Sequence, residues 1–201
     1  QMLTQQGDNV SVFAVKGNFD DAQSGVKQIF SDSKYNEYLN EKGFKLSSAN
    51  SINWGRLLPQ IVYYFSAYAD LVNDKKITMG DKVNFTVPTG NFGDILAGFY
   101  AKCMGLPVNR LICASNSNNV LTDFLKTGTY DRNREFFKTI SPSMDILISS
   151  NLERLLYHIT NDATKIKSYM EKLQSTGCYQ VDEVTLKAIQ ETFSAGYLDD
   201  N

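Results

Sequence analysis

The stretch that decides the fold is KVNFTVPTGNFGDILAGFYAKCMGLP, Lys82 to Pro107. It opens with alternating apolar residues, which predict a β-strand over Lys82–Pro88 with one apolar face. An apolar pattern of helical spacing then runs from Phe92 to Met104, and the glycine and proline of Gly105–Pro107 end it. The strand therefore passes through a tight turn with two glycines directly into a helix, which is how a βαβ unit begins.

Strand-like and helix-like segments alternate on both sides of this stretch. Such alternation predicts an α/β fold with a parallel βαβ sheet of about four strands, flanked by helices and joined by right-handed crossovers. In the helical pattern of Trp54–Val72 we expect a kink or a later helix start at Pro59, because proline conflicts with an unbroken helix. The other predicted strands are Val10–Val15, Phe44–Ser48 and Arg110–Ala114, and the other predicted helices cover Ala22–Phe30 and Val120–Lys126.

The pattern changes near Asp131, and a mostly helical tail is predicted from there. The first helix begins with the S-x-x-E capping box of Ser150–Glu153 and continues to about Thr160. The second covers Ala163–Gln174 and stops near Gly177. The third is capped by Asp182 and ends at Ala195–Gly196. We therefore divide the chain into an α/β domain, residues 1–130, which carries the two-glycine turn, and a mostly helical segment, residues 131–201.

The composition is that of an ordinary soluble globular protein, since 42% of the 201 residues are hydrophobic and 21% are charged. The net charge of −2 and the scattered lysines and arginines give no electrostatic reason to expect a nucleic-acid partner. No apolar run approaches the roughly 18 residues that cross a bilayer, and no signal-peptide pattern opens the chain. We therefore expect a cytoplasmic protein without a membrane partner.

The residue types that most often bind metals show no such pattern here. The three cysteines are an odd number without metal-ligand spacing, so reduced and mostly buried thiols are expected. Asp20 and Asp21 are adjacent, which turns them about 100° apart on a helix, so they predict a helix cap rather than a metal site. His158 lies in the apolar stretch LLYHIT and is interpreted as structural. No metal site is predicted.

The turn VPTGNFGD, Val87 to Asp94, has the features of an anion-binding loop. A helix that starts directly after a strand directs its unpaired N–H groups and the positive end of its dipole toward the turn. Gly90 and Gly93 can adopt positive φ and let an anion approach the backbone closely. The spacing matches neither the P-loop nor the dinucleotide motif, so a glycine turn without a ligand stays open as the alternative. Asp94 would repel a phosphate, so its side chain is expected to turn away and cap the helix.

Five stretches of this chain, in the same order, resemble threonine synthases. VPTGNFGDILAGFYAKCMGLP resembles the segment by which these enzymes hold the phosphate of pyridoxal 5′-phosphate (PLP). The other four are GNFDDAQSGVKQIF, SSANSINWGRLLPQIVYYF, LKTGTY and SPSMDILISSNLERLL. The resemblance covers nearly the whole chain and implies the PLP-enzyme fold of the tryptophan synthase β type. It also implies an activity, the conversion of O-phosphohomoserine and water to L-threonine and phosphate.

The resemblance implies roles for two groups of residues. The cofactor-phosphate loop would be formed by Gly90, Asn91, Phe92, Gly93 and Asp94. The polar cluster Asn50, Ser51, Asn53 and Arg56 would lie on the substrate side. There the planar guanidinium of Arg56 could clamp a phosphate or a carboxylate. An alternative stays open, in which Asn50–Asn53 only caps the helix that begins near Trp54.

Two further polar stretches have no assigned role. Ser141–Asp145 matches the family strongly, but the sequence suggests no function for it. Asn116–Asn119 follows a predicted strand, where it is either an ordinary loop or part of the edge at which α/β sheets bind ligands.

The catalytic lysine of the family has no counterpart in this sequence. The resemblance places it in a phenylalanine-lysine-aspartate motif upstream of these residues, and no such tripeptide occurs; Lys45 in GFKL lacks the aspartate. We therefore expect an interior part of the enzyme, without the Schiff-base lysine and without the segment that completes the cofactor pocket. Such a part would be inactive alone and would bind PLP weakly or not at all.

Alternative functions are a non-catalytic phosphate- or PLP-binding module and a structural domain. Self-association could cover exposed apolar surface.

Overall fold

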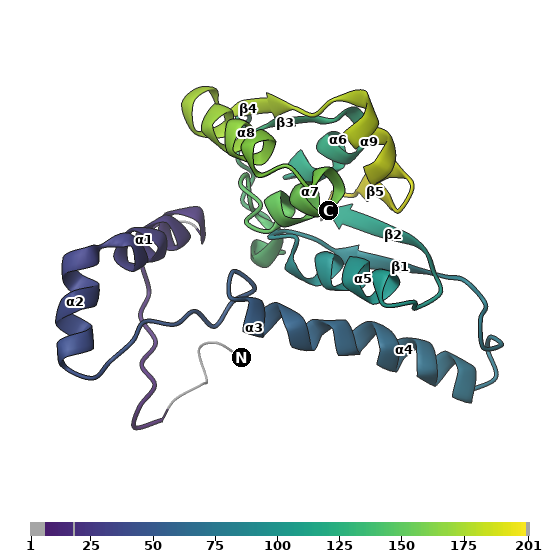
Figure 1. Cartoon of the computed structure of the whole chain (residues 1–201), viewed down its shortest axis with the longest axis horizontal. Helices are drawn as coiled ribbons and strands as arrows, with labels where there is room; N and C mark the ends of the chain where they lie inside the picture. The colour runs from purple at the N-terminus through teal and green to yellow at the C-terminus, as the bar shows by residue number, and fades with distance from the viewer. Residues whose placement is uncertain (1–6, 18, 200–201) are drawn as a thin grey trace. The chain divides into compact units, whose positions relative to one another are not determined.

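A computed structural model describes residues 7–17 and 19–199 of the chain (Figure 1). The chain forms two compact units, Gln1–Leu46 and Ser47–Asn201. The predicted domain boundary, between residues 130 and 131, falls inside the second unit. That unit contains the sheet and the two-glycine turn.

The first unit contains two helices, α1 (Phe19–Ser31) and α2 (Ser33–Glu41). Helix α1 confirms the helical pattern predicted over residues 22–30. The strand predicted over Val10–Val15 is wrong: Val10 makes only an isolated bridge to Gly7, and Phe13 is 84% exposed. A run of apolar residues becomes a strand only where a partner strand pairs with its backbone, and within the described residues no strand does so here.

The second unit is built on a parallel sheet of three strands, ordered β1–β2–β5. Strand β1 (Val83–Pro88) pairs in parallel with β2 (Val108–Ser115), which pairs in parallel with β5 (Phe193–Tyr197). The predicted parallel α/β sheet is thus confirmed. Residues 44–48, which were expected to form another strand, have no regular structure.

The third strand comes from a segment that the sequence assigned to a helix. Helix α9 (Glu183–Gln190) begins after Asp182 as predicted, but it ends before residues 193–197, which form β5. Phe193 is buried in the core, and its ring lies 5.6 Å from that of Phe92 and 6.0 Å from that of Phe99. Pairing with β2 and this burial therefore override the local helical pattern.

Helices pack onto the sheet from several parts of the second unit. Helix α5 (Gly93–Cys103) follows β1, and α6 (Val120–Thr127) follows β2. The predicted kink at Pro59 is confirmed, because a short 3-10 helix, η1 (Leu58–Gln60), separates α3 (Trp54–Leu57) from α4 (Ile61–Asn73). Helix α4 packs along α5, as Figure 1 shows.

The remaining elements surround a second part of the core. They are β3 (Thr129–Asp131), η2 (Pro142–Met144), α7 (Leu152–Thr160), α8 (Ala163–Thr176) and β4 (Cys178–Gln180), with β3 and β4 antiparallel. Gly177 adopts φ 76° and ends α8, as the sequence predicted. The predicted capping box at Ser150–Glu153 is wrong, because Asn151 is the N-cap of α7 and its side chain makes no capping bond.

Candidate phosphate-binding site

The two-glycine turn connects the end of β1 to the start of α5. The residue that turns the backbone is Phe92, with φ 63°, and neither Gly90 nor Gly93 lies in the left-handed region. The positive φ that glycine allows is therefore not used at either position. The left-handed conformation is costly for a residue with a side chain, and here the complete burial of the Phe92 ring against the core offsets that cost.

The glycines are instead required by close packing. A Cβ atom at Gly93 would lie only 2.3 Å from Oγ of Ser51. A Cβ atom at Gly90 would lie 3.0 Å from the main-chain oxygen of Ser143. The turn is thus enclosed between the segment around Ser51 and the segment around Ser143, and only glycine allows both to approach the backbone.

The start of α5 leaves main-chain donors available. The side chain of Asn91 accepts a hydrogen bond from the N–H of Gly93 at 3.0 Å. No acceptor among the described residues occupies the next two N–H groups, those of Asp94 and Ile95. These groups lie at the positive end of the helix dipole, so this end of α5 favours an anion.

Asn151 supports the turn through hydrogen bonds to its main chain. Its main-chain N–H and its side-chain Nδ2 both donate to the main-chain oxygen of Asn91, at 3.1 and 3.0 Å. Nδ2 also lies 3.1 Å from Oγ of Ser51, and Arg154 donates to Oδ1 of Asn151 at 2.7 Å and to the main-chain oxygen of Ser51 at 2.9 Å. Ser149 donates to the main-chain oxygen of Gly90 at 3.0 Å. The turn is therefore fixed by side chains that the sequence analysis did not select.

Asp94 does not form the expected helix cap. The N-cap of α5 is Phe92, and Oδ1 of Asp94 is buried without a hydrogen-bond partner among the described residues. Burial raises the pKa of this carboxyl group above its usual range, and the nearby hydroxyl of Tyr64 partly offsets the rise. That hydroxyl donates to the main-chain oxygen of Asp94 at 2.8 Å.

Replacing Asp94 by asparagine is expected to stabilise the protein. A raised pKa in the folded state means that the stability contributed by this group is present below about pH 3.9 and is lost as the pH rises through the raised value. The free energy of unfolding of Asp94→Asn should therefore exceed that of the original protein by about 1 kcal/mol at pH 7, allowing for partial solvent screening, and by little near pH 3. Urea unfolding at both pH values measures this.

Asp162→Asn is the matched control for that experiment. Asp162 is exposed and caps α8 by accepting from the N–H of Lys165, and asparagine caps a helix equally well. It should leave the free energy of unfolding unchanged. If the free energy of unfolding of Asp94→Asn at pH 7 were equal to or lower than that of the original protein, burial of the Asp94 carboxylate would not be destabilising, and the prediction would be wrong.

Of the polar cluster predicted on the substrate side, Asn50, Ser51 and Asn53 lie in the bend before α3, and Arg56 lies within α3. Asn53 caps α3 by accepting from the N–H of Gly55 at 2.9 Å, and Asn50 accepts from the N–H of Ile52 at 3.1 Å. Arg56 is exposed, and its Nε donates to the main-chain oxygen of Ala49 at 3.0 Å. Of these residues, Ser51 lies directly against the turn, where it limits the space at Gly93.

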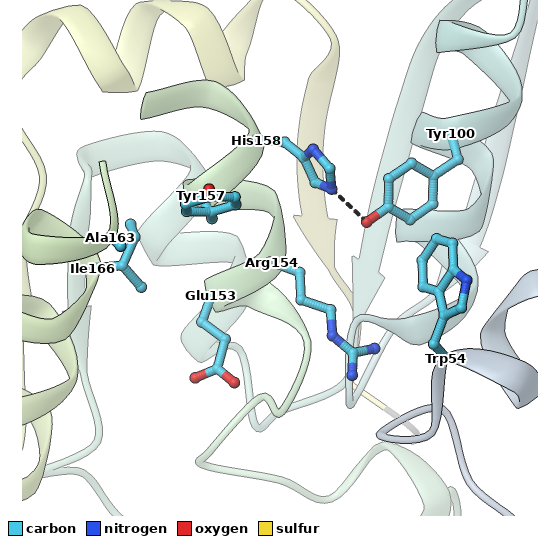
Figure 2. Close-up of a pocket in the computed structure, with 8 residues that line it drawn as sticks. All are labelled: Trp54, Tyr100, Glu153, Arg154, Tyr157, His158, Ala163 and Ile166. Atoms are coloured by element: carbon cyan, nitrogen blue, oxygen red, sulfur yellow. Dashed lines mark hydrogen bonds between the residues drawn. The ribbon is translucent and has the colours of Figure 1, made fainter. Parts of the chain in front are cut away.

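A separate open cavity of about 480 Å³ lies between α5 and α7 (Figure 2). Trp54, Tyr100, Arg154 and His158 are among the residues that line it. The hydroxyl of Tyr100 lies 2.7 Å from Nε2 of His158, so the only histidine of the chain takes part in a side-chain hydrogen bond.

The cysteines are unpaired, with Cys113 buried and Cys103 exposed. Within residues 7–17 and 19–199, no cluster of histidine, cysteine and acidic residues could hold a metal ion, and no helix is long and apolar enough to cross a membrane.

Taken together, these elements define an α/β protein in which helix α5 begins directly after strand β1. No protein-family model matches the chain. It is 48% identical over 200 residues to threonine synthase-like 1 of Homo sapiens, a match that covers 98% of this chain and 27% of that protein. It is 40% identical over 205 residues to threonine synthase of Saccharomyces cerevisiae, covering 97% of this chain and 38% of the enzyme.

Among solved structures, the chain is similar to a PLP-bound threonine synthase from Brucella melitensis. The TM-score is 0.78 at 45% sequence identity, over 92% of this chain and 38% of that one. The chain thus spans between about a quarter and two fifths of the length of these relatives. By sequence and by fold, the chain is similar to part of the threonine synthases.

Proposed function

We propose that Gly90–Asp94 binds the phosphate group of PLP, and that the chain forms the cofactor-phosphate part of an enzyme of the threonine synthase kind. The observation that carries this proposal is a pair of main-chain N–H groups at the start of α5, those of Asp94 and Ile95, for which the described residues provide no acceptor. They belong to a turn whose shape is fixed by Asn151 and Ser149. The similarity to a structure described as PLP-bound supports the same ligand here.

The donors of the turn suit a phosphate. A phosphate group offers several strong acceptor oxygens, and main-chain N–H groups at a helix N-terminus bind such groups without a charged side chain. Ser51 can add a donor, since Nδ2 of Asn151 donates to its oxygen and no described residue accepts its proton. The close packing at Gly90 and Gly93 excludes water from one side of the turn, which strengthens these bonds.

The proposed reaction is the conversion of O-phosphohomoserine and water to L-threonine and phosphate. PLP would supply the electron sink for this chemistry. The residues of this chain would hold the phosphate end of the cofactor and so orient its ring. Asn50, Asn53 and Arg56 would lie on the substrate side, where the exposed guanidinium of Arg56 is suited to a phosphate or carboxylate.

We also propose that the chain alone has no threonine synthase activity, because its sequence contains no phenylalanine-lysine-aspartate motif. Titration of the chain with PLP and with inorganic phosphate should show weak, reversible binding of both. Reduction with borohydride in the presence of PLP should leave no single lysine labelled to completion, and no threonine should form. Calorimetry, mass spectrometry of the reduced protein and an amino-acid assay measure the three results.

The outcomes separate the two parts of the proposal. Binding of neither phosphate nor PLP would contradict the assignment of the turn. A single, fully labelled lysine together with threonine formation would contradict the absence of activity.

A further inference from the structure

We propose that Asp145 is a positioning residue for the phosphate loop, Gly90–Asp94. Its effect on the backbone of the loop follows from the structure alone, and its effect on ligand affinity rests on the proposed function. Asp145 belongs to the Ser141–Asp145 stretch, for which the sequence suggested no role. It lies outside the loop and would act on it through the segment that packs against Gly90.

Asp145 is a buried carboxylate, 4% exposed, that accepts four hydrogen bonds. Its Oδ1 accepts from Nδ2 of Asn116 at 2.8 Å, from Nδ2 of Asn118 at 3.0 Å and from Oγ1 of Thr139 at 2.7 Å. Its Oδ2 accepts from the main-chain N–H of Thr139 at 2.9 Å. Hydrogen bonds to a charged acceptor are about twice as strong as neutral ones, so this side chain ties together the segments that supply the donors.

The donors come from two different places in the chain. Asn116 and Asn118 follow the end of β2, and Thr139 precedes η2. The end of β2 is itself joined to the start of the turn, because the N–H of Thr89 donates to the main-chain oxygen of Ala114 at 2.9 Å. Asp145 therefore connects the segment that contains η2 to the strand next to the phosphate loop.

The segment that Asp145 holds forms one wall of the loop. The main-chain oxygen of Ser143 would lie 3.0 Å from a Cβ atom at Gly90, and Cα of Met144 would lie at 3.4 Å. Farther along, Tyr130 fixes the same segment, because its hydroxyl donates to the main-chain oxygen of Leu147 at 3.0 Å and accepts from the N–H of Ser149 at 2.8 Å. Asp145 thus holds the wall directly after its contact with Gly90, and Tyr130 holds it a few residues farther along the chain.

A loop that binds an anion through main-chain N–H groups depends on the accuracy of its backbone, because these groups must converge on one ligand position. Loosening the wall would allow Gly90 to move and would spread the N–H groups apart. Asp145 would then affect ligand binding without touching the ligand, and this separates it from a residue that serves stability alone.

Hydrogen exchange of the whole chain, followed by mass spectrometry of its peptides, tests the inference without a ligand. Asp145→Asn keeps the size of the side chain but removes its charge and turns one acceptor into a donor. Exchange of the amides in residues 89–95 should become about tenfold faster, while residues 163–176 of α8 should exchange as before. Asp162→Asn, the same chemical change at the exposed cap of α8, should leave both segments unchanged. If Asp145→Asn does not fold, Thr139→Val, which removes one bond to Oδ1, should show the same pattern with a smaller change.

Affinity for inorganic phosphate and for PLP is the second measurement. Asp145→Asn should weaken both by about tenfold, and Asp162→Asn should weaken neither. Exchange that speeds up only in residues 137–145, or equally throughout the chain, would overturn the inference, because the side chain would then have a local or a general structural role. If the original protein binds neither ligand, the proposed function fails, and the exchange of residues 89–95 still decides the role of Asp145.

Discussion

Replacing Gly93 by valine is expected to abolish phosphate and PLP binding and to lower the free energy of unfolding by about 3 kcal/mol, at the upper end of the cost of overpacking. A Cβ atom at Gly93 would lie 2.3 Å from Oγ and 2.5 Å from Cβ of Ser51. Ser51 cannot move aside easily, because Asn151 and Arg154 are hydrogen-bonded to it. The added side chain therefore displaces either Ser51 or the start of α5, and both belong to the proposed site.

Calorimetric titration and urea unfolding measure the two effects. Gly93→Ala should show the same changes in smaller degree, and adding Ser51→Gly, which removes both clashing atoms, should restore part of the lost stability. Gly196→Ala is the matched control, because no heavy atom outside its chain neighbours lies within 4 Å of the added Cβ. A Gly93→Val protein that binds phosphate as tightly as the original chain would rule out the site.

Replacing Asn151 by alanine is expected to lower the free energy of unfolding by about 2–4 kcal/mol. The residue is completely buried, and the change removes its side-chain donor Nδ2, which is hydrogen-bonded to the main-chain oxygen of Asn91 and to Oγ of Ser51, and the acceptor used by Arg154. The main-chain N–H of residue 151 keeps its bond to Asn91. Arg154 then keeps a partly buried guanidinium with one hydrogen-bond partner fewer, which is costly. Because Asn151 fixes the turn, phosphate affinity should fall as well.

The control for Asn151 is Asn109→Ala. Asn109 also donates from its side chain, to Oδ1 of Asn84 at 2.9 Å, but this pair is exposed to solvent. Its loss should change the free energy of unfolding by less than about 0.5 kcal/mol. If Asn151→Ala were no more destabilising than Asn109→Ala in urea unfolding, Asn151 would not be the support of the turn.

The parts of the fold that depend on local sequence could be predicted. The strand at Val83–Pro88, the helix that follows it and the interruption at Pro59 depend on alternation, helical spacing and the geometry of proline, and all three were found. The errors in assigning strands concern pairing that is not local. Val10–Val15 has the residues of a strand but no partner strand within the described residues. Residues 193–197 form a strand because they pair with an edge of β2.

For the candidate site, the sequence predicted the position of the turn but not the contacts that fix its shape. The position of the turn was clear from two glycines between a strand and a helix, but the reason for the glycines was not. Their need for space arises from Ser51 and Ser143, which lie about 40 and 50 residues away in sequence. Asn151 could be recognised only as a polar residue before a helix, because its contact with Asn91 exists only in three dimensions.

The position of β5 in the sheet also has a consequence for the way the protein is made. Because β2 lies between β1 and β5, it can pair with β1 as soon as both have left the ribosome. Its other edge has no partner until residues 193–197 have been synthesised, since Leu111 is paired with Phe193. An unpaired edge of an apolar strand is a template for association with other chains. The growing chain therefore exposes this edge in the interval between translation of β2 and translation of β5, and a chaperone that covers the edge would act in that interval.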